Sequence, residues 1–74
     1  MKEKVLELLT EVNEEIATYE GENLLEDEII TSLEVIEIVS ALEDEFGITI
    51  SAKNISKANF ATVDSICDLV ESLQ

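Results

Sequence analysis

One apolar spacing occurs twice in the chain and restricts its fold to a helical one. Side chains at i, i+3, i+4, i+7 and i+11 are apolar in both stretches, and they are Val5, Leu8, Leu9, Val12 and Ile16, then Val35, Ile38, Val39, Leu42 and Phe46. Such spacing places a single apolar stripe along an amphipathic helix. It predicts one helix from Lys2 to about Ala17 and a second from about Ser32 to Phe46.

The ends of the second helix and the start of a third are marked by their chemistry. Thr31 and Glu34 have the spacing of a capping box, in which each side chain binds the backbone N–H of the other residue. Gly47 suits the left-handed position after the last helical turn. Thr62 is a plausible N-cap for a last helix, because helical apolar spacing continues from Val63 to the end of the sequence.

The segments between these helices carry weaker patterns. Residues 18–30 lose the helical spacing but contain the apolar pairs Leu24-Leu25 and Ile29-Ile30, so we expect a long loop pinned to the core. Residues 52–58 are expected to form one or two helical turns. The sequence therefore predicts an all-α fold, a small three-to-four-helix bundle with a long first loop and a short third helix, in one domain of residues 1–74.

The residue content excludes several kinds of reactive site. Histidine is absent and cysteine occurs once, so the usual zinc sites and any Ser-His-Asp or Cys-His catalytic set are excluded. The acidic run 26–28 lacks the spacing of an EF-hand loop, and helical spacing puts Cys67 on a buried face as a small hydrophobe. We expect a non-catalytic protein with no metal site. A lone cysteine, no apolar signal segment and no run of ~20 apolar residues predict a cytoplasmic location without a membrane span.

The charge is strongly negative and unevenly placed. The chain has 18 acidic residues and four lysines, a formal charge of −14, and residues 5–52 contain fourteen of the acids and no base. This balance excludes nucleic acid as a partner and favours basic proteins. Glu34, Glu37 and Asp44 share one side of the second helix. They are either solvated groups that keep a small protein soluble or part of a docking surface.

The position of Ser32 is the most informative single feature. A serine at the start of a helix is by default an N-cap. If Thr31 forms the cap with Glu34, however, Ser32 becomes the first helical residue and its hydroxyl has no capping role. That hydroxyl would face solvent at the positive end of the helix dipole, where an anionic group such as a phosphodiester is favoured.

At this point the sequence resembles a known family. Residues 30–33, Ile-Thr-Ser-Leu, are followed by EVIEIVSALEDEF and by Gly-Ile-Thr-Ile at 47–50, and this pattern is similar to that of acyl carrier proteins. The resemblance covers nearly the whole chain. It implies a carrier that holds an acyl or aminoacyl group as a thioester on a 4′-phosphopantetheine arm, which a phosphopantetheinyl transferase attaches to Ser32 from coenzyme A. By position, the face read by partner enzymes would comprise Leu33, Glu34, Ile36, Glu37, Ser40 and Asp44.

The resemblance also implies the kind of partner, and the chain departs from the family pattern in two places. Basic-surfaced enzymes that load or transfer acyl or aminoacyl groups are the expected partners of a monomeric carrier. Thr31 stands where the family usually has aspartate, and Ser40 stands where fatty-acid carriers typically have methionine. Residues 59–62, Asn-Phe-Ala-Thr, look more like discrete carriers of aminoacyl or specialised acyl groups, including D-alanyl carrier proteins, than like fatty-acid or polyketide carriers. The pathways that the resemblance suggests are fatty-acid, polyketide or nonribosomal peptide biosynthesis. The alternative function is an unmodified acidic helical adaptor that docks basic proteins.

Repulsion among the acids generates a first prediction. Glu3, Glu7, Glu11 and Glu15 stand four residues apart on the first helical stretch, where each like-charge pair costs roughly 0.2–0.5 kcal/mol. Added salt or divalent cations are therefore expected to raise the melting temperature, because they screen this repulsion. A thermal unfolding series over ionic strength measures the effect. A flat response would contradict the prediction.

Overall fold

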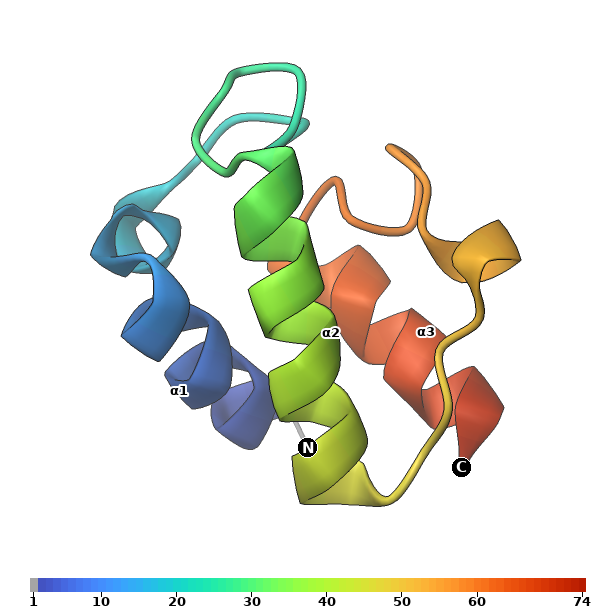
Figure 1. The fold of residues 1–74 in the computed structure, drawn as a ribbon. Coiled ribbons are helices and arrows are strands. Elements are labelled where there is room, and N and C mark those ends of the chain that lie inside the picture. The colour runs from blue at the N-terminus through green and yellow to red at the C-terminus, as the bar shows by residue number, and fades with distance from the viewer. Residues whose placement is uncertain (1) are drawn as a thin grey trace.

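The computed structural model describes residues 2–74, and it is helical throughout its regular parts (Figure 1). In chain order the elements are α1 (Lys2–Val12), the 3₁₀ helix η1 (Glu14–Thr18), α2 (Ser32–Phe46), the 3₁₀ helix η2 (Ala52–Asn54) and α3 (Val63–Leu73). No strand occurs in this part of the chain. The prediction of an all-α bundle is confirmed.

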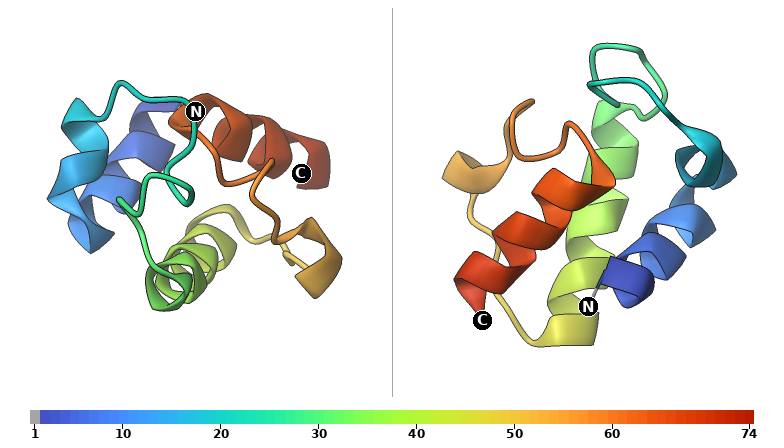
Figure 2. Two further views of the ribbon diagram at one scale, coloured as in Figure 1. Left: turned by 90° about the horizontal axis from the view of Figure 1, so that it is seen from above. Right: turned by 180° about the vertical axis from the view of Figure 1, so that it is seen from behind.

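The helices enclose a single apolar core. α1 packs against both α2 and α3, and α1 and η2 lie on opposite sides of the bundle (Figure 2). The buried side chains form one cluster, and they are Val5, Leu9, Ile16, Leu24, Ile30, Val35, Ile38, Leu42, Ile48, Ile50, Phe60, Ile66, Cys67, Leu69 and Val70. Cys67 belongs to this cluster as predicted, and burial raises the pKa of its thiol. It packs as a small hydrophobe.

The first helix is shorter than predicted. α1 ends at Val12, and Asn13 adopts an extended conformation in which its side chain accepts a hydrogen bond from the Glu15 N–H. Asparagine competes in this way with the helical backbone, so the helix stops and a 3₁₀ turn begins. Ile16 in η1 is nevertheless buried. The apolar spacing therefore continued past the point where the helix ended.

The long loop after η1 is tied to the core, as expected. Leu24 is fully buried, and its N–H donates to the carbonyl of Ala61 over 2.7 Å. The Tyr19 hydroxyl donates to the Asp27 carboxylate and accepts from the Asn23 N–H at 2.6 Å. Desolvation and the bond to Asp27 raise the pKa of Tyr19, so the hydroxyl keeps its proton and closes this part of the loop.

The predicted ends of α2 and the predicted start of α3 are confirmed, and the helix expected over residues 52–58 is shorter than predicted. Thr31 and Glu34 form the capping box of α2, and Thr62 caps α3 in a second box that Ser65 completes. The carboxylate of Glu43 accepts from the Ile50 N–H at 2.8 Å, which holds the extended chain after α2. The third helix expected over residues 52–58 is a single 3₁₀ turn at Ala52–Asn54.

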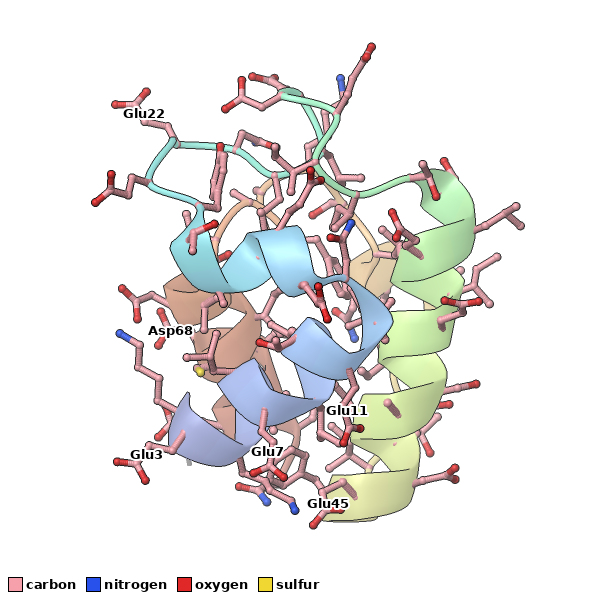
Figure 3. All side chains as sticks on the ribbon, turned by 90° about the vertical axis from the view of Figure 1, so that its left-hand side faces the viewer. Glu3, Glu7, Glu11, Glu22, Glu45 and Asp68 are labelled. Atoms are coloured by element: carbon pink, nitrogen blue, oxygen red, sulfur yellow. The ribbon has the colours of Figure 1, made fainter. Side chains whose placement is uncertain are left out.

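Most acidic side chains have no basic partner in the fold. Figure 3 shows Glu3, Glu7 and Glu11 directed outward from α1. Within residues 2–74 the ion pairs are Lys2 with Asp64 at 2.7 Å and Lys4 with Glu45 at 3.8 Å, all four side chains being well exposed. Exposed pairs of this kind contribute little to stability. The negative charge is therefore largely uncompensated within the described chain.

Gly47 allows a direct test of how α2 ends. Its φ of 62° lies in the left-handed region, and a Cβ at this position would contact nothing within 4 Å. Replacement by alanine is therefore a purely conformational change, expected to cost about 1 kcal/mol and to lower the melting temperature by roughly 4–8 °C. Asparagine, which tolerates this conformation better, should fall between glycine and alanine. Equal thermal stability of the Gly47→Ala protein and the wild type would contradict this account.

Candidate cofactor attachment site

Ser32 is the first residue of α2 and is exposed to solvent. The capping bonds are made by its neighbours: the Thr31 hydroxyl accepts from the Glu34 N–H at 3.2 Å, and the Glu34 carboxylate accepts from the Thr31 N–H at 2.9 Å. Ser32 therefore has no capping role. Its hydroxyl lies at the positive end of a helix of 15 residues, where negative charge is stabilised.

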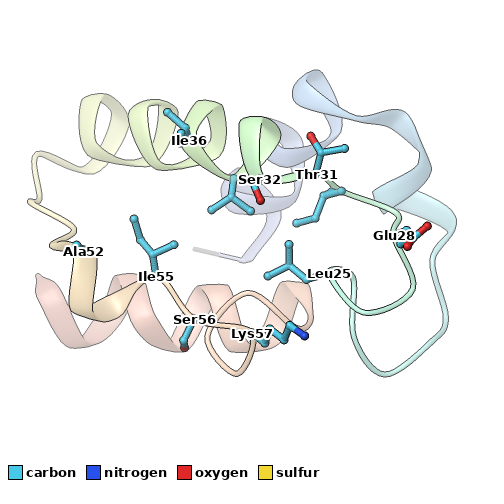
Figure 4. Close-up of a pocket in the computed structure, with 11 residues that line it drawn as sticks. Leu25, Glu28, Thr31, Ser32, Ile36, Ala52, Ile55, Ser56 and Lys57 are labelled. Carbon is cyan, nitrogen blue, oxygen red and sulfur yellow. The ribbon is translucent and has the colours of Figure 1, made fainter.

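A groove of about 850 Å³ opens beside this serine. Its walls come from α2, from the long loop and from the segment around η2, and the lining residues are Leu25, Glu28, Ile30, Thr31, Ser32, Val35, Ile36, Ala52, Ile55, Ser56 and Lys57. Figure 4 shows the Ser32 side chain directed from α2 toward the segments that carry Leu25 and Ile55. An attached group could thus enter a largely apolar groove.

Two charged residues stand in the groove wall. Glu28 is held at a φ of 59°, the one non-glycine residue of the described chain with positive φ. Its neighbour Ile29 donates to the carbonyl of Leu24 at 2.9 Å, which closes the turn that returns the loop to α2. Lys57 is exposed on the opposite segment. The sequence patterns did not predict a groove lined by these residues together with Leu25 and Ile55, because all four lie outside the periodic segments.

The predicted partner-facing residues divide into two groups. With 100° per helical residue, Leu33, Ile36, Glu37, Ser40 and Asp44 fall within about 100° of one another on α2. All five are exposed, and Leu33 and Ile36 expose 75% and 60% of their surface, which is unusual for large apolar side chains. We call these five residues the α2 face.

Glu34 lies outside the α2 face. It is half-buried, and besides its cap bond its carboxylate accepts from the side-chain amide of Asn13 at 3.1 Å. The same amide donates to the carbonyl of Ile29 at 2.7 Å. Asn13 is a site residue that sequence reasoning missed. No local signal points to it, because its partners lie 16 and 21 positions away.

Some arrangements are not found in the described part of the chain. No three Cys, Asp or Glu side chains in residues 2–74 come together as a metal-binding group. None of the helices there combines the length and the apolar character that a membrane crossing requires.

A helical bundle that displays a free serine hydroxyl beside an apolar groove has the architecture of a carrier domain. A family model described as "Phosphopantetheine attachment site" matches residues 2–70. Because the match spans nearly the whole sequence, the chain belongs to this family of phosphopantetheine carriers, of the acyl carrier protein type. No match was found among curated proteins or among solved structures.

The prosthetic group of the family is 4′-phosphopantetheine, and the residues present fit it. The group needs a hydroxyl to which its phosphate can be joined, and Ser32 offers one that is exposed and outside the capping bonds. The helix N-terminus favours the phosphodiester charge. The apolar side chains of Leu25, Ile36 and Ile55 border the adjoining groove. When bound, the group supplies a thiol that holds cargo as a thioester.

Proposed function

We propose that Ser32 is the attachment residue and that the protein presents an acyl or aminoacyl group to partner enzymes. The exposed Ser32 hydroxyl at the mouth of the groove is the observation that carries this proposal. Thr31 and Glu34 hold the first turn of α2, so the hydroxyl is kept outward without a competing hydrogen-bond duty. The chain itself binds and presents; domains of this family are typically non-catalytic.

Mass spectrometry after incubation with coenzyme A and a broad-specificity phosphopantetheinyl transferase tests the attachment residue. The wild-type protein is expected to gain the mass of one phosphopantetheine, and Ser32→Ala is expected to gain none. Ser40→Ala is the matched control, because Ser40 is also exposed on α2. Modification of Ser32→Ala would contradict the proposal. A wild-type protein that stays unmodified with several transferases would instead favour the acidic adaptor.

The α2 face is the proposed docking surface for these enzymes. It joins two exposed apolar side chains, Leu33 and Ile36, to the carboxylates of Glu37 and Asp44. Neither carboxylate forms an ion pair with a described residue. Such a face suits partners with apolar pockets bordered by lysine and arginine, and its charge would accelerate their approach. Glu34 is not part of this face, because its carboxylate binds the Thr31 N–H and the Asn13 amide and so stabilises the start of α2.

A charge reversal on the α2 face is expected to slow partner recognition. Glu37→Lys should lower kcat/KM for phosphopantetheine transfer by about fivefold at low salt, equivalent to ~1 kcal/mol, and by less at high salt. Glu11→Lys on α1 is the matched control, because it makes the same charge change at an exposed glutamate of another helix. Equal rates for the two variants at low salt would contradict the docking proposal. Circular dichroism of both variants verifies that the fold is retained.

For the cargo we favour an aminoacyl or specialised acyl group over a fatty-acid or polyketide chain. The resemblance at residues 59–62 supports this choice, although three of those side chains have structural roles here, Thr62 being the cap of α3. Phe60 is fully buried in the core, and the Asn59 amide donates to the carbonyl of Asn54 at 2.7 Å. Ser40 on the α2 face, in place of the methionine typical of fatty-acid carriers, is the remaining support.

A further inference from the structure

The side chain of Asn13 connects the end of α1 to the segment that leads into α2. Its Oδ1 accepts from the Glu15 N–H at 2.9 Å. Its amide nitrogen donates to the Ile29 carbonyl at 2.7 Å and to the Glu34 carboxylate at 3.1 Å. An asparagine side chain offers two N–H donors on one nitrogen together with an acceptor oxygen, and all of them are used here.

These bonds converge on the residues around Ser32. Ile29 lies three positions before the serine and Glu34 two positions after it. The Glu34 carboxylate binds Asn13 through Oε2 and the Thr31 N–H through Oε1 at 2.9 Å. Asn13 itself is held between α1 and η1, because its N–H donates to the Leu9 carbonyl at 2.9 Å. One side chain from the N-terminal part of the chain thus fixes both sides of the serine.

We propose that Asn13 is a positioning residue for Ser32. Its amide holds the loop end and the first turn of α2 in the arrangement that presents the serine hydroxyl to a transferase. Without the amide, the Ile29 carbonyl and the Glu34 carboxylate lose a shared donor, and the turn that contains Thr31 and Ser32 gains freedom. The inference rests on the proposed attachment of phosphopantetheine to Ser32.

The cap that the Asn13 oxygen provides for η1 can be separated by substitution from the bonds that the Asn13 amide donates to Ile29 and Glu34. Asn13→Asp keeps an oxygen that can cap η1, but it places a carboxylate against the Glu34 carboxylate and the Ile29 carbonyl. Adding Glu34→Gln restores a donor from the other side, because the glutamine amide can donate to the new carboxylate at position 13 while its oxygen still accepts from the Thr31 N–H. The double variant therefore exchanges the amide and the carboxylate between the two positions.

Two measurements on the full chain test the proposal. The first is kcat and KM for transfer of phosphopantetheine from coenzyme A by a purified transferase. The second is amide hydrogen exchange, measured by NMR on the unmodified protein. Asn13→Asp is expected to lower kcat about tenfold and to accelerate exchange at Thr31 and Glu34 about tenfold, while exchange at Ile66 and Val70 in α3 stays within about twofold of the wild type. The double variant is expected to recover part of both losses, because it restores the contact between positions 13 and 34 but leaves the Ile29 carbonyl without its donor.

Other outcomes would overturn the proposal. Wild-type transfer kinetics in Asn13→Asp would do so, and so would equally accelerated exchange in α2 and α3, which would indicate general destabilisation. If Asn13→Asp does not fold, Asn13→Ser serves instead, because it keeps a capping oxygen and lacks the amide. If the wild type accepts no phosphopantetheine, the proposed function fails by itself. Unchanged exchange at Thr31 would then overturn the positioning role as well, and faster exchange confined to Thr31 and Glu34 would support it.

Discussion

Burial of one apolar face from each of three short helices holds this protein together. Within residues 2–74 the buried side chains are all apolar, and no buried side-chain oxygen or nitrogen lacks a hydrogen-bond partner. A domain of this size buries only about 60% of the surface of its unfolded chain, so its margin of stability is small. The loop residues Leu24, Ile30 and Phe60 therefore add to stability beside the helices, because each contributes a fully or almost fully buried side chain to the core.

The same core forces nearly all the charge onto the surface. With 18 acids and four lysines, the chain cannot neutralise itself, and the two ion pairs of the described residues lie on exposed side chains of α1, α2 and α3. At the end of α2 that carries Ser32, the acidic side chain of Glu34 is hydrogen-bonded within the chain. There the carboxylate of Glu34 is satisfied by the Thr31 N–H and the Asn13 amide. Glu34 thus differs from the exposed acids, because both of its carboxylate oxygens accept hydrogen bonds within the chain.

The sequence predicted the helices best where two signals agreed. The bounds of α2 and the start of α3 followed from apolar spacing together with capping residues, namely Thr31, Gly47 and Thr62. The end of α1 was missed because Ile16 continues the apolar spacing beyond Asn13. In that case the local competition of an asparagine side chain outweighed the periodic pattern.

Of the candidate site, the sequence pointed only to the residues of α2. The candidate attachment residue Ser32 came from the assignment of the cap to Thr31 and from the family resemblance. The residues of the α2 face were implied by that resemblance, and helical geometry groups them on one side of α2. The groove could not be predicted, because Leu25 and Ile55 belong to segments without periodicity and meet α2 only in the folded chain. The contact of Asn13 with Glu34 spans 21 positions and has no pattern in the sequence.

Ser32 and the start of α1 lie at opposite ends of the bundle, because α2 runs from one end to the other (Figure 1). Its 15 residues span about 22 Å at 1.5 Å per residue, and α1 begins and α3 ends near the end of α2 that is remote from Ser32 (Figure 1). An attachment at either of those points, to a surface or to a neighbouring protein domain, would hold the bundle at the end that is remote from Ser32. The serine and its groove would then point away from the anchor and remain free to turn toward one enzyme after another.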